Sequence, residues 1–150
     1  MGTISAGEGN SSYIHAGPSG LLLPIIWRIL SALALLAMGG IHLYLVLDGV
    51  GGVLGVLFVL NAIGGLLLAI AMLAAPRRLL PLASVLGLLF IVGTLLALVL
   101  ALTVGLFGIA EKLDGQLVPT TLVVESIGII VLAVTTALAY RMQRTRPRHG

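Results

Sequence analysis

The sequence lacks cysteine altogether and has few charged residues among its 150. The absence of cysteine excludes disulfide bonds, thiolate metal sites and thiol redox chemistry. Charged side chains make up 9% of the chain, whereas a soluble domain carries about 25%. So few charges cannot cover a surface that faces water, and 59% of the residues are hydrophobic. The composition therefore predicts an integral membrane protein.

Four apolar runs are long enough to cross about 30 Å of hydrocarbon, which takes roughly 20 helical residues. They occupy residues 29–47, 53–75, 79–109 and 118–140. Continuous apolar runs do not alternate as barrel strands do, so we expect helices. Short links make consecutive helices antiparallel neighbours. The predicted fold class is all-α, an integral membrane antiparallel four-helix bundle within residues 21–140. At 1.5 Å per residue the third run would be about 45 Å long, and we expect it to tilt or to project from the membrane.

Basic residues gather at one end of the predicted bundle. All the arginines of the chain lie at this end: Arg28, those of the 76–78 turn and those of the tail 141–150. The opposite end has only Lys112. Because positive residues favour the cytoplasmic side, both termini are predicted to be cytoplasmic, in a bacterial plasma membrane. Residues 1–20 are rich in Gly and Ser and are predicted to form a flexible tail, and residues 141–150 a basic one.

Small residues recur every four positions in the third run, at Gly93, Ala97, Ala101 and Gly105. Such a packing ridge lets another helix backbone approach closely. Gly65 with Ala69 forms a shorter ridge in the second run. Packing inside the bundle and oligomerisation through the third-run ridge are both consistent with this spacing.

Glu125 is the only acidic residue well inside any apolar run, and a carboxylate at that depth is costly. His42, Asn61 and Thr103 occupy the other three runs at a similar depth, roughly 5–13 Å below the outer boundary at 1.5 Å per residue. Thr121 shares a helix face with Glu125. We expect His42, Asn61 and Glu125 to converge on a pocket open to the outside. The candidate ligand or proton site comprises His42, Asn61, Thr103, Thr121 and Glu125.

Three interpretations of this polar cluster remain open. The first is a hydrogen-bonded clasp in which a neutral or His42-paired Glu125 fixes the helices. The second is a proton- or cation-coupled transport site, or a small-ligand site, with a protonatable Glu125 and His42 as its relay. The third is a redox cofactor or metal site. A quinone headgroup fits this class best, because His15 and His149 lie in the tails and a metal would have only two good ligands.

Phosphate-binding loops, Ser/His/Asp triads and the HExxH motif are absent, so we predict no catalytic residues, no metal site and no cofactor. The predicted function is a membrane accessory or interaction protein with an outward-facing polar pocket. The alternatives are a small proton- or cation-coupled transporter using Glu125, or a quinone- or haem-associated subunit. The expected partners are the lipid bilayer and either another membrane protein or a second copy. Arginines that anchor helix ends explain the net charge of +3 without nucleic acid.

Three short segments of this sequence resemble segments of one protein group. They are Gly-Ile-His-Leu-Tyr-Leu at 40–45, Leu-Phe-Val-Leu-Asn-Ala at 57–62, and Gly-Leu-Phe-Gly at 105–108 followed by Glu111. The group is the small, largely uncharacterised four-span integral membrane proteins of actinobacteria, and the likeness spans about residues 27–140. It implies the fold and the organism group but no activity. Small multidrug transporters also have four spans and an essential membrane Glu, but in their first helix. The first run here has no Glu, so that function is not carried over.

Overall fold

The computed structural model describes residues 19–105 and 117–144, which form four α-helices. Their bounds are Ser19–Leu47 for α1, Gly52–Ala74 for α2, Leu80–Thr103 for α3 and Val118–Arg144 for α4. All four are long and apolar enough to cross a membrane. The predicted all-α four-helix bundle is confirmed, and the chain is a multi-pass membrane protein. The two tails, apart from Ser19, Gly20 and residues 141–144, lie outside the described residues.

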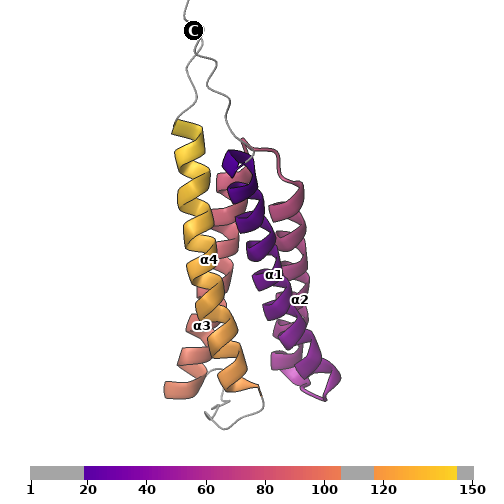
Figure 1. The fold of residues 1–150 in the computed structure, drawn as a ribbon. Coiled ribbons are helices and arrows are strands. Elements are labelled where there is room, and N and C mark those ends of the chain that lie inside the picture. Colours follow the sequence, from indigo (N-terminus) through magenta and orange to yellow (C-terminus); the bar gives the residue numbers. More distant parts are fainter. Residues whose placement is uncertain (1–18, 106–116, 145–150) are drawn as a thin grey trace, which may run out of the picture.

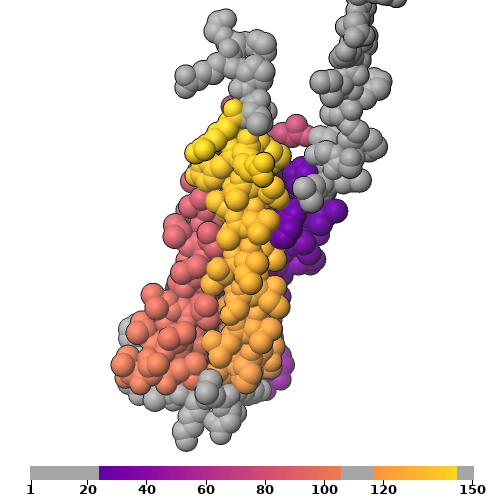
Figure 2. All heavy atoms as spheres, turned by 60° about the vertical axis from the view of Figure 1, so that its left-hand side comes forward, coloured from indigo at the N-terminus to yellow at the C-terminus, as the bar shows by residue number. Residues whose placement is uncertain are grey.

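The helices follow one another around the bundle, so that α1 packs against α2 and α4, and α4 against α3 (Figure 1). Contacts between α2 and α3 are sparse by comparison. We call the end with residues 76–79 the Arg77 end and the end with residues 48–51 the Asp48 end. The pair α1/α2 and the pair α3/α4 diverge toward the Asp48 end in Figure 1. Figure 2 shows α4 beside α3, with α1 beside the part of α4 nearer the Arg77 end.

α1 begins ten residues before the predicted start of the first span, so that Arg28 lies inside the helix. Its Nε donates a hydrogen bond to the Met72 carbonyl at 2.9 Å. Its Nη2 donates to the carbonyls of Leu73 and Ala75, both at 2.8 Å. Arg28 thus satisfies the last carbonyls of α2, which have no partner within that helix.

The third span is shorter than predicted, because α3 ends at Thr103 and not near Ile109. Gly105 follows with φ +79°, a left-handed conformation that glycine adopts without strain and that ends helices. Ile109 itself lies outside the described residues. At 1.5 Å per residue the 24 residues of α3 extend about 36 Å, close to the thickness of a bilayer core. The tilt or projection expected of a 45 Å helix is therefore not required.

α1 ends in a turn that also depends on glycine. Gly49 has φ +107° and donates its N–H to the Val46 carbonyl at 3.1 Å. The next N–H, of Val50, reaches the Leu45 carbonyl at 3.0 Å. This pair of bonds is the Schellman motif, which satisfies carbonyls at a helix end and reverses the chain. The short connection holds α2 antiparallel and adjacent to α1.

α1 and α2 approach most closely at two glycines. A Cβ at Gly65 would lie 2.8 Å from the Leu35 carbonyl oxygen and 3.4 Å from Gly39 Cα. A Cβ at Gly39 would in turn lie 3.3 Å from the Ala62 carbonyl oxygen. Since lipid provides no hydrophobic drive for helix association, such close backbone packing is what holds membrane helices together. The ridge predicted at Gly65 and Ala69 is therefore an α1–α2 contact.

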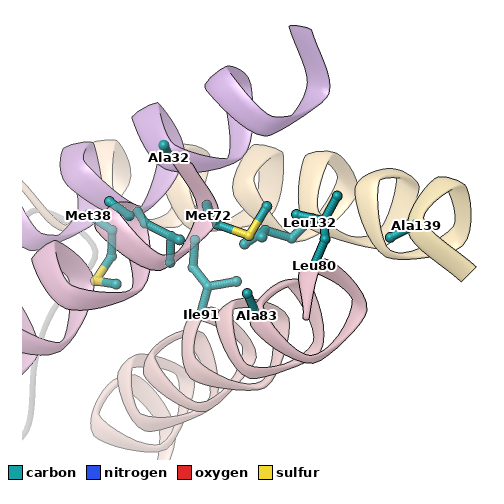
Figure 3. Packing of buried hydrophobic residues seen from close by; sticks show 10 residues of the cluster. Ala32, Met38, Met72, Leu80, Ala83, Ile91, Leu132 and Ala139 are labelled. Atoms are coloured by element: carbon teal, nitrogen blue, oxygen red, sulfur yellow. The ribbon is translucent and has the colours of Figure 1, made fainter. Parts of the chain in front are cut away.

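Buried apolar side chains from all four helices meet between the Arg77 end and the middle of the bundle (Figure 3). Leu80 and Ala139 lie near the Arg77 end of this core, whereas Met38 and Ile91 lie near the helix midpoints. Ser31 and Thr135 share a hydrogen bond of 2.8 Å within the same region, which links α1 to α4. This apolar core does not extend through the half of the bundle toward the Asp48 end.

Gly65→Ala is expected to destabilise the protein, because the added Cβ would meet the α1 backbone. Overpacking of this kind costs about 1–3 kcal/mol. Gly93→Ala is the matched control, since nothing lies within 4 Å of a Cβ at that position, and the change removes about 1 kcal/mol of the helix penalty of glycine. Thermal unfolding in detergent should give a lower midpoint for Gly65→Ala alone. Equal midpoints for the two variants would contradict the close contact.

Candidate functional site

A cavity of about 740 Å³ occupies the half of the bundle toward the Asp48 end. All four helices contribute to its lining, with most of the residues coming from α2 and α3. The sparse contact between these two helices leaves the space open. They meet at Phe90, whose ring lies so close to Gly64 that a Cβ there would be 2.7 Å away.

The ridge of small residues on α3 forms one wall of this cavity. Gly93, Ala97 and Ala101 all line it, and no atom lies within 4 Å of a Cβ position at Gly93. Of the two interpretations of the ridge, packing inside the bundle is therefore not observed at Gly93. The fourth member, Gly105, lies beyond the end of α3. The small side chains of α3 leave space for the cavity and do not bring another helix backbone close, because α2 packs against α1 and makes few contacts with α3.

His42 lines the cavity and is 8% exposed. Its Nδ1 lies 2.9 Å from the Met38 carbonyl oxygen, one turn earlier on α1. A carbonyl only accepts hydrogen bonds, so Nδ1 carries the proton, and in the neutral ring Nε2 is left as an acceptor. The ring also packs edge-on against Phe58, with centroids 4.9 Å apart and an interplanar angle of 78°. Two contacts thus fix the orientation of the imidazole.

Asn61, Thr94 and Thr121 supply the other polar side chains of the lining. The Thr94 hydroxyl donates to the Ile91 carbonyl and the Thr121 hydroxyl to the Leu117 carbonyl, each at 2.9 Å. Because each hydroxyl has one proton, both threonines offer a ligand only acceptor lone pairs. The half-buried Asn61 has an amide that can both donate and accept. The polar part of the lining is therefore rich in acceptors.

Glu125 is fully buried, with an exposed fraction of 0%, one helical turn beyond Thr121 on α4. It is not itself part of the cavity lining. Neither carboxyl oxygen has a hydrogen-bond partner among the described residues. The Thr94 hydroxyl lies close to the carboxyl, but its one proton goes to the Ile91 carbonyl, so it has no proton to donate to Glu125. The described part of the chain thus shows no hydrogen-bonded clasp at Glu125, and the α1–α4 clasp is Ser31 with Thr135.

The structure brings most of the predicted site residues together. His42, Asn61 and Thr121 line one cavity, and the buried Glu125 follows Thr121 by one turn of α4 without lining the cavity itself. Thr103 does not belong to the site, because it is exposed near the end of α3 and donates to the Val99 carbonyl at 2.8 Å. The sequence interpretation missed Thr94. Thr94 precedes Ala97 by three positions and Ala101 by seven, and this helical spacing is the signal that could have placed it on the same helix face.

The chain matches no model of a protein family, no curated protein and no solved structure. The likeness to four-span membrane proteins of actinobacteria therefore stays a prediction, and the site has to be interpreted from its own geometry.

Glu125→Met is expected to raise the free energy of unfolding by about 1–3 kcal/mol, because it removes a buried polar group without partners and keeps a similar volume. Thr135→Val is the contrasting variant. It keeps the shape of the side chain but breaks the bond to Ser31, so it should lower stability. Chemical denaturation in mixed micelles compares the two. A loss of stability in Glu125→Met would mean that the carboxyl has a stabilising partner.

Proposed function

We propose that this protein is an integral membrane binding protein, of the accessory or interaction type, that holds a mainly apolar molecule in the cavity at the Asp48 end. The observation that supports this most directly is the placement of His42 and Asn61 on a cavity whose lining is otherwise largely apolar. Binding sites for small molecules have volumes of about 300–1,000 Å³ and combine apolar walls with a few fixed polar groups. The cavity of about 740 Å³ fits this description.

The ligand reaches the cavity from the lipid, between α2 and α3. Leu60 on α2 and Leu89 on α3 both belong to the lining, yet they are 59% and 62% exposed. Exposed leucines at the rim of a cavity in a membrane-spanning bundle face hydrocarbon chains. A lipid-soluble molecule can therefore enter without crossing water.

The polar group of the ligand is a hydrogen-bond donor. The Nε2 of neutral His42 and the hydroxyls of Thr94 and Thr121 present acceptors, and the Asn61 amide is the one side chain in this set with a free donor. A hydroxyl or an amine can satisfy these acceptors, whereas a quinone carbonyl has only Asn61 to bind. Within the redox interpretation, the reduced, hydroxyl-bearing form is thus favoured.

The cavity lies in the outer half of a bacterial plasma membrane, and both termini are cytoplasmic. The support for this orientation is the set of arginines at the Arg77 end, which includes Arg28, Arg77 and Arg78 together with Arg141 and Arg144 at the end of α4. Basic residues near helix ends stay on the cytoplasmic side.

A reporter that is active only in the cytoplasm, fused after Gly150, should therefore be active in bacterial cells. The same reporter inserted between Gly49 and Val50, in the α1–α2 turn, should be silent. The reverse pattern would place the cavity in the inner half of the membrane and overturn the orientation.

Ala97→Phe should weaken binding of 2-naphthylmethanol, an apolar probe with one hydroxyl, by at least tenfold, because the new ring occupies the cavity. Val99→Phe is the matched control, since Val99 is 41% exposed on the same helix and outside the lining. Equilibrium dialysis of the detergent-solubilised protein measures both dissociation constants. Equal affinities in the two variants, or no binding to the unchanged protein, would refute a ligand site in this cavity.

A further inference from the structure

We propose that Glu125 is a proton-exchange site, at which a protonated lipophilic amine in the cavity takes the place of the carboxyl proton. This inference rests on the proposed function, because it needs the cavity to bind a ligand. It adds the chemical class of that ligand and a coupling between ligand and proton.

Packing does not account for Glu125. An ionised carboxylate buried without partners is far costlier than a neutral carboxyl group, and even the neutral group loses hydrogen bonds to water. Its exposed fraction is 0%, and both oxygens lack partners among the described residues. The link between α1 and α4 is made elsewhere, by Ser31 and Thr135. A buried polar group without a hydrogen-bond partner costs stability, so its presence points to a use other than holding the fold together.

Two side chains connect the carboxyl to the cavity. Thr121 lines the cavity one turn before Glu125 on the same face of α4, and side chains so spaced have Cβ atoms about 5–6 Å apart. Thr94 lines the cavity from α3 and also lies close to the carboxyl. A charged group bound beside these threonines would approach the carboxyl, and an opposite charge within about 4–6 Å stabilises a carboxylate.

The surroundings of Glu125 favour a cation that carries N–H donors. The cavity presents acceptors at His42 Nε2 and at both threonine hydroxyls, and an ammonium group has three protons to donate. Phe58 and Phe90 belong to the same lining and offer aromatic faces that attract cations. An alcohol satisfies the same acceptors but provides no charge for Glu125.

Among the described residues, no group near the cavity other than Glu125 supplies the balancing charge. α2 and α3 contain no titratable side chain. α1 contributes His42, whose Nδ1 proton is held by Met38, and the exposed Tyr44. Asp48 follows α1 as an exposed residue, and the other charged residues of α4 lie at the Arg77 end. In the described part of the chain, Glu125 is therefore the buried acid that can pair with a bound ammonium.

The exchange conserves charge within the protein. An ammonium ion enters the cavity, the O–H bond of the Glu125 carboxyl breaks, and its proton leaves to water. The buried site holds a neutral acid before binding and a neutral ion pair afterwards. Amine affinity should consequently rise tenfold for each unit of pH as long as Glu125 of the free protein is protonated, with one proton released per amine bound.

The test uses two probes of the same shape, 2-naphthylmethylamine and 2-naphthylmethanol, with the full chain in detergent. Dissociation constants are measured at several pH values at which the free amine is protonated. Proton release is followed with an indicator dye in weak buffer. For the unchanged protein we expect one proton released per amine bound and an affinity that rises with pH. The alcohol should release none and show no pH dependence.

Glu125→Gln should lose proton release and at least tenfold in amine affinity, while it keeps alcohol binding, which also shows that the variant is folded. Asp48→Asn removes an exposed carboxylate and should behave as the unchanged protein. Alcohol binding without proton release by the amine, or amine affinity unaltered in Glu125→Gln, would overturn the exchange and leave the proposed function intact. Failure of both probes to bind the unchanged protein would refute the proposed function itself.

Discussion

The backbones of α1 and α2 approach each other so closely at Gly39 and Gly65 that even an added Cβ would crowd the facing backbone, and the arrangement of the other helices depends on this contact. α2 is drawn toward α1 and away from α3. Near the Arg77 end, Arg28 joins α1 to the last turn of α2, and the apolar core fills the interior. Toward the Asp48 end nothing closes the distance between α2 and α3, and the cavity results.

The bundle itself could be predicted, because the number of helices and their order follow from composition and from run length. Where a helix boundary differs from the predicted one, it depends on a local interaction that hydropathy does not describe. Arg28 is accommodated inside a helix because two carbonyls of α2 and the carbonyl of Ala75, which follows it, accept its protons. α3 ends early because Gly105 takes a left-handed conformation, although the apolar composition continues past it.

The candidate site could be predicted only in part. Helix depth places His42, Asn61 and Glu125 at one level, and helical spacing adds Thr121. Thr103 is included in the predicted site because of its depth alone. Depth does not define the direction in which a side chain points around the helix axis. The cavity and the role of Gly93 depend on the distance between α2 and α3, which no single-helix pattern encodes. That Glu125 lacks a partner likewise became evident only from the packed bundle.

Leu60 and Leu89 are exposed residues of the cavity lining, and under the proposed function the membrane leaflet around the Asp48 end, and not the aqueous phase, would be the reservoir of the ligand. Each methylene added to a ligand favours its transfer out of water by about 0.8 kcal/mol, roughly a fourfold enrichment in the leaflet. A ligand with one more methylene would thus show a lower dissociation constant when its concentration in water is used, although it makes no new contact with the protein. Selectivity among related ligands would therefore be divided between lipid and protein, and two-dimensional diffusion within the leaflet would bring the ligand to the cavity.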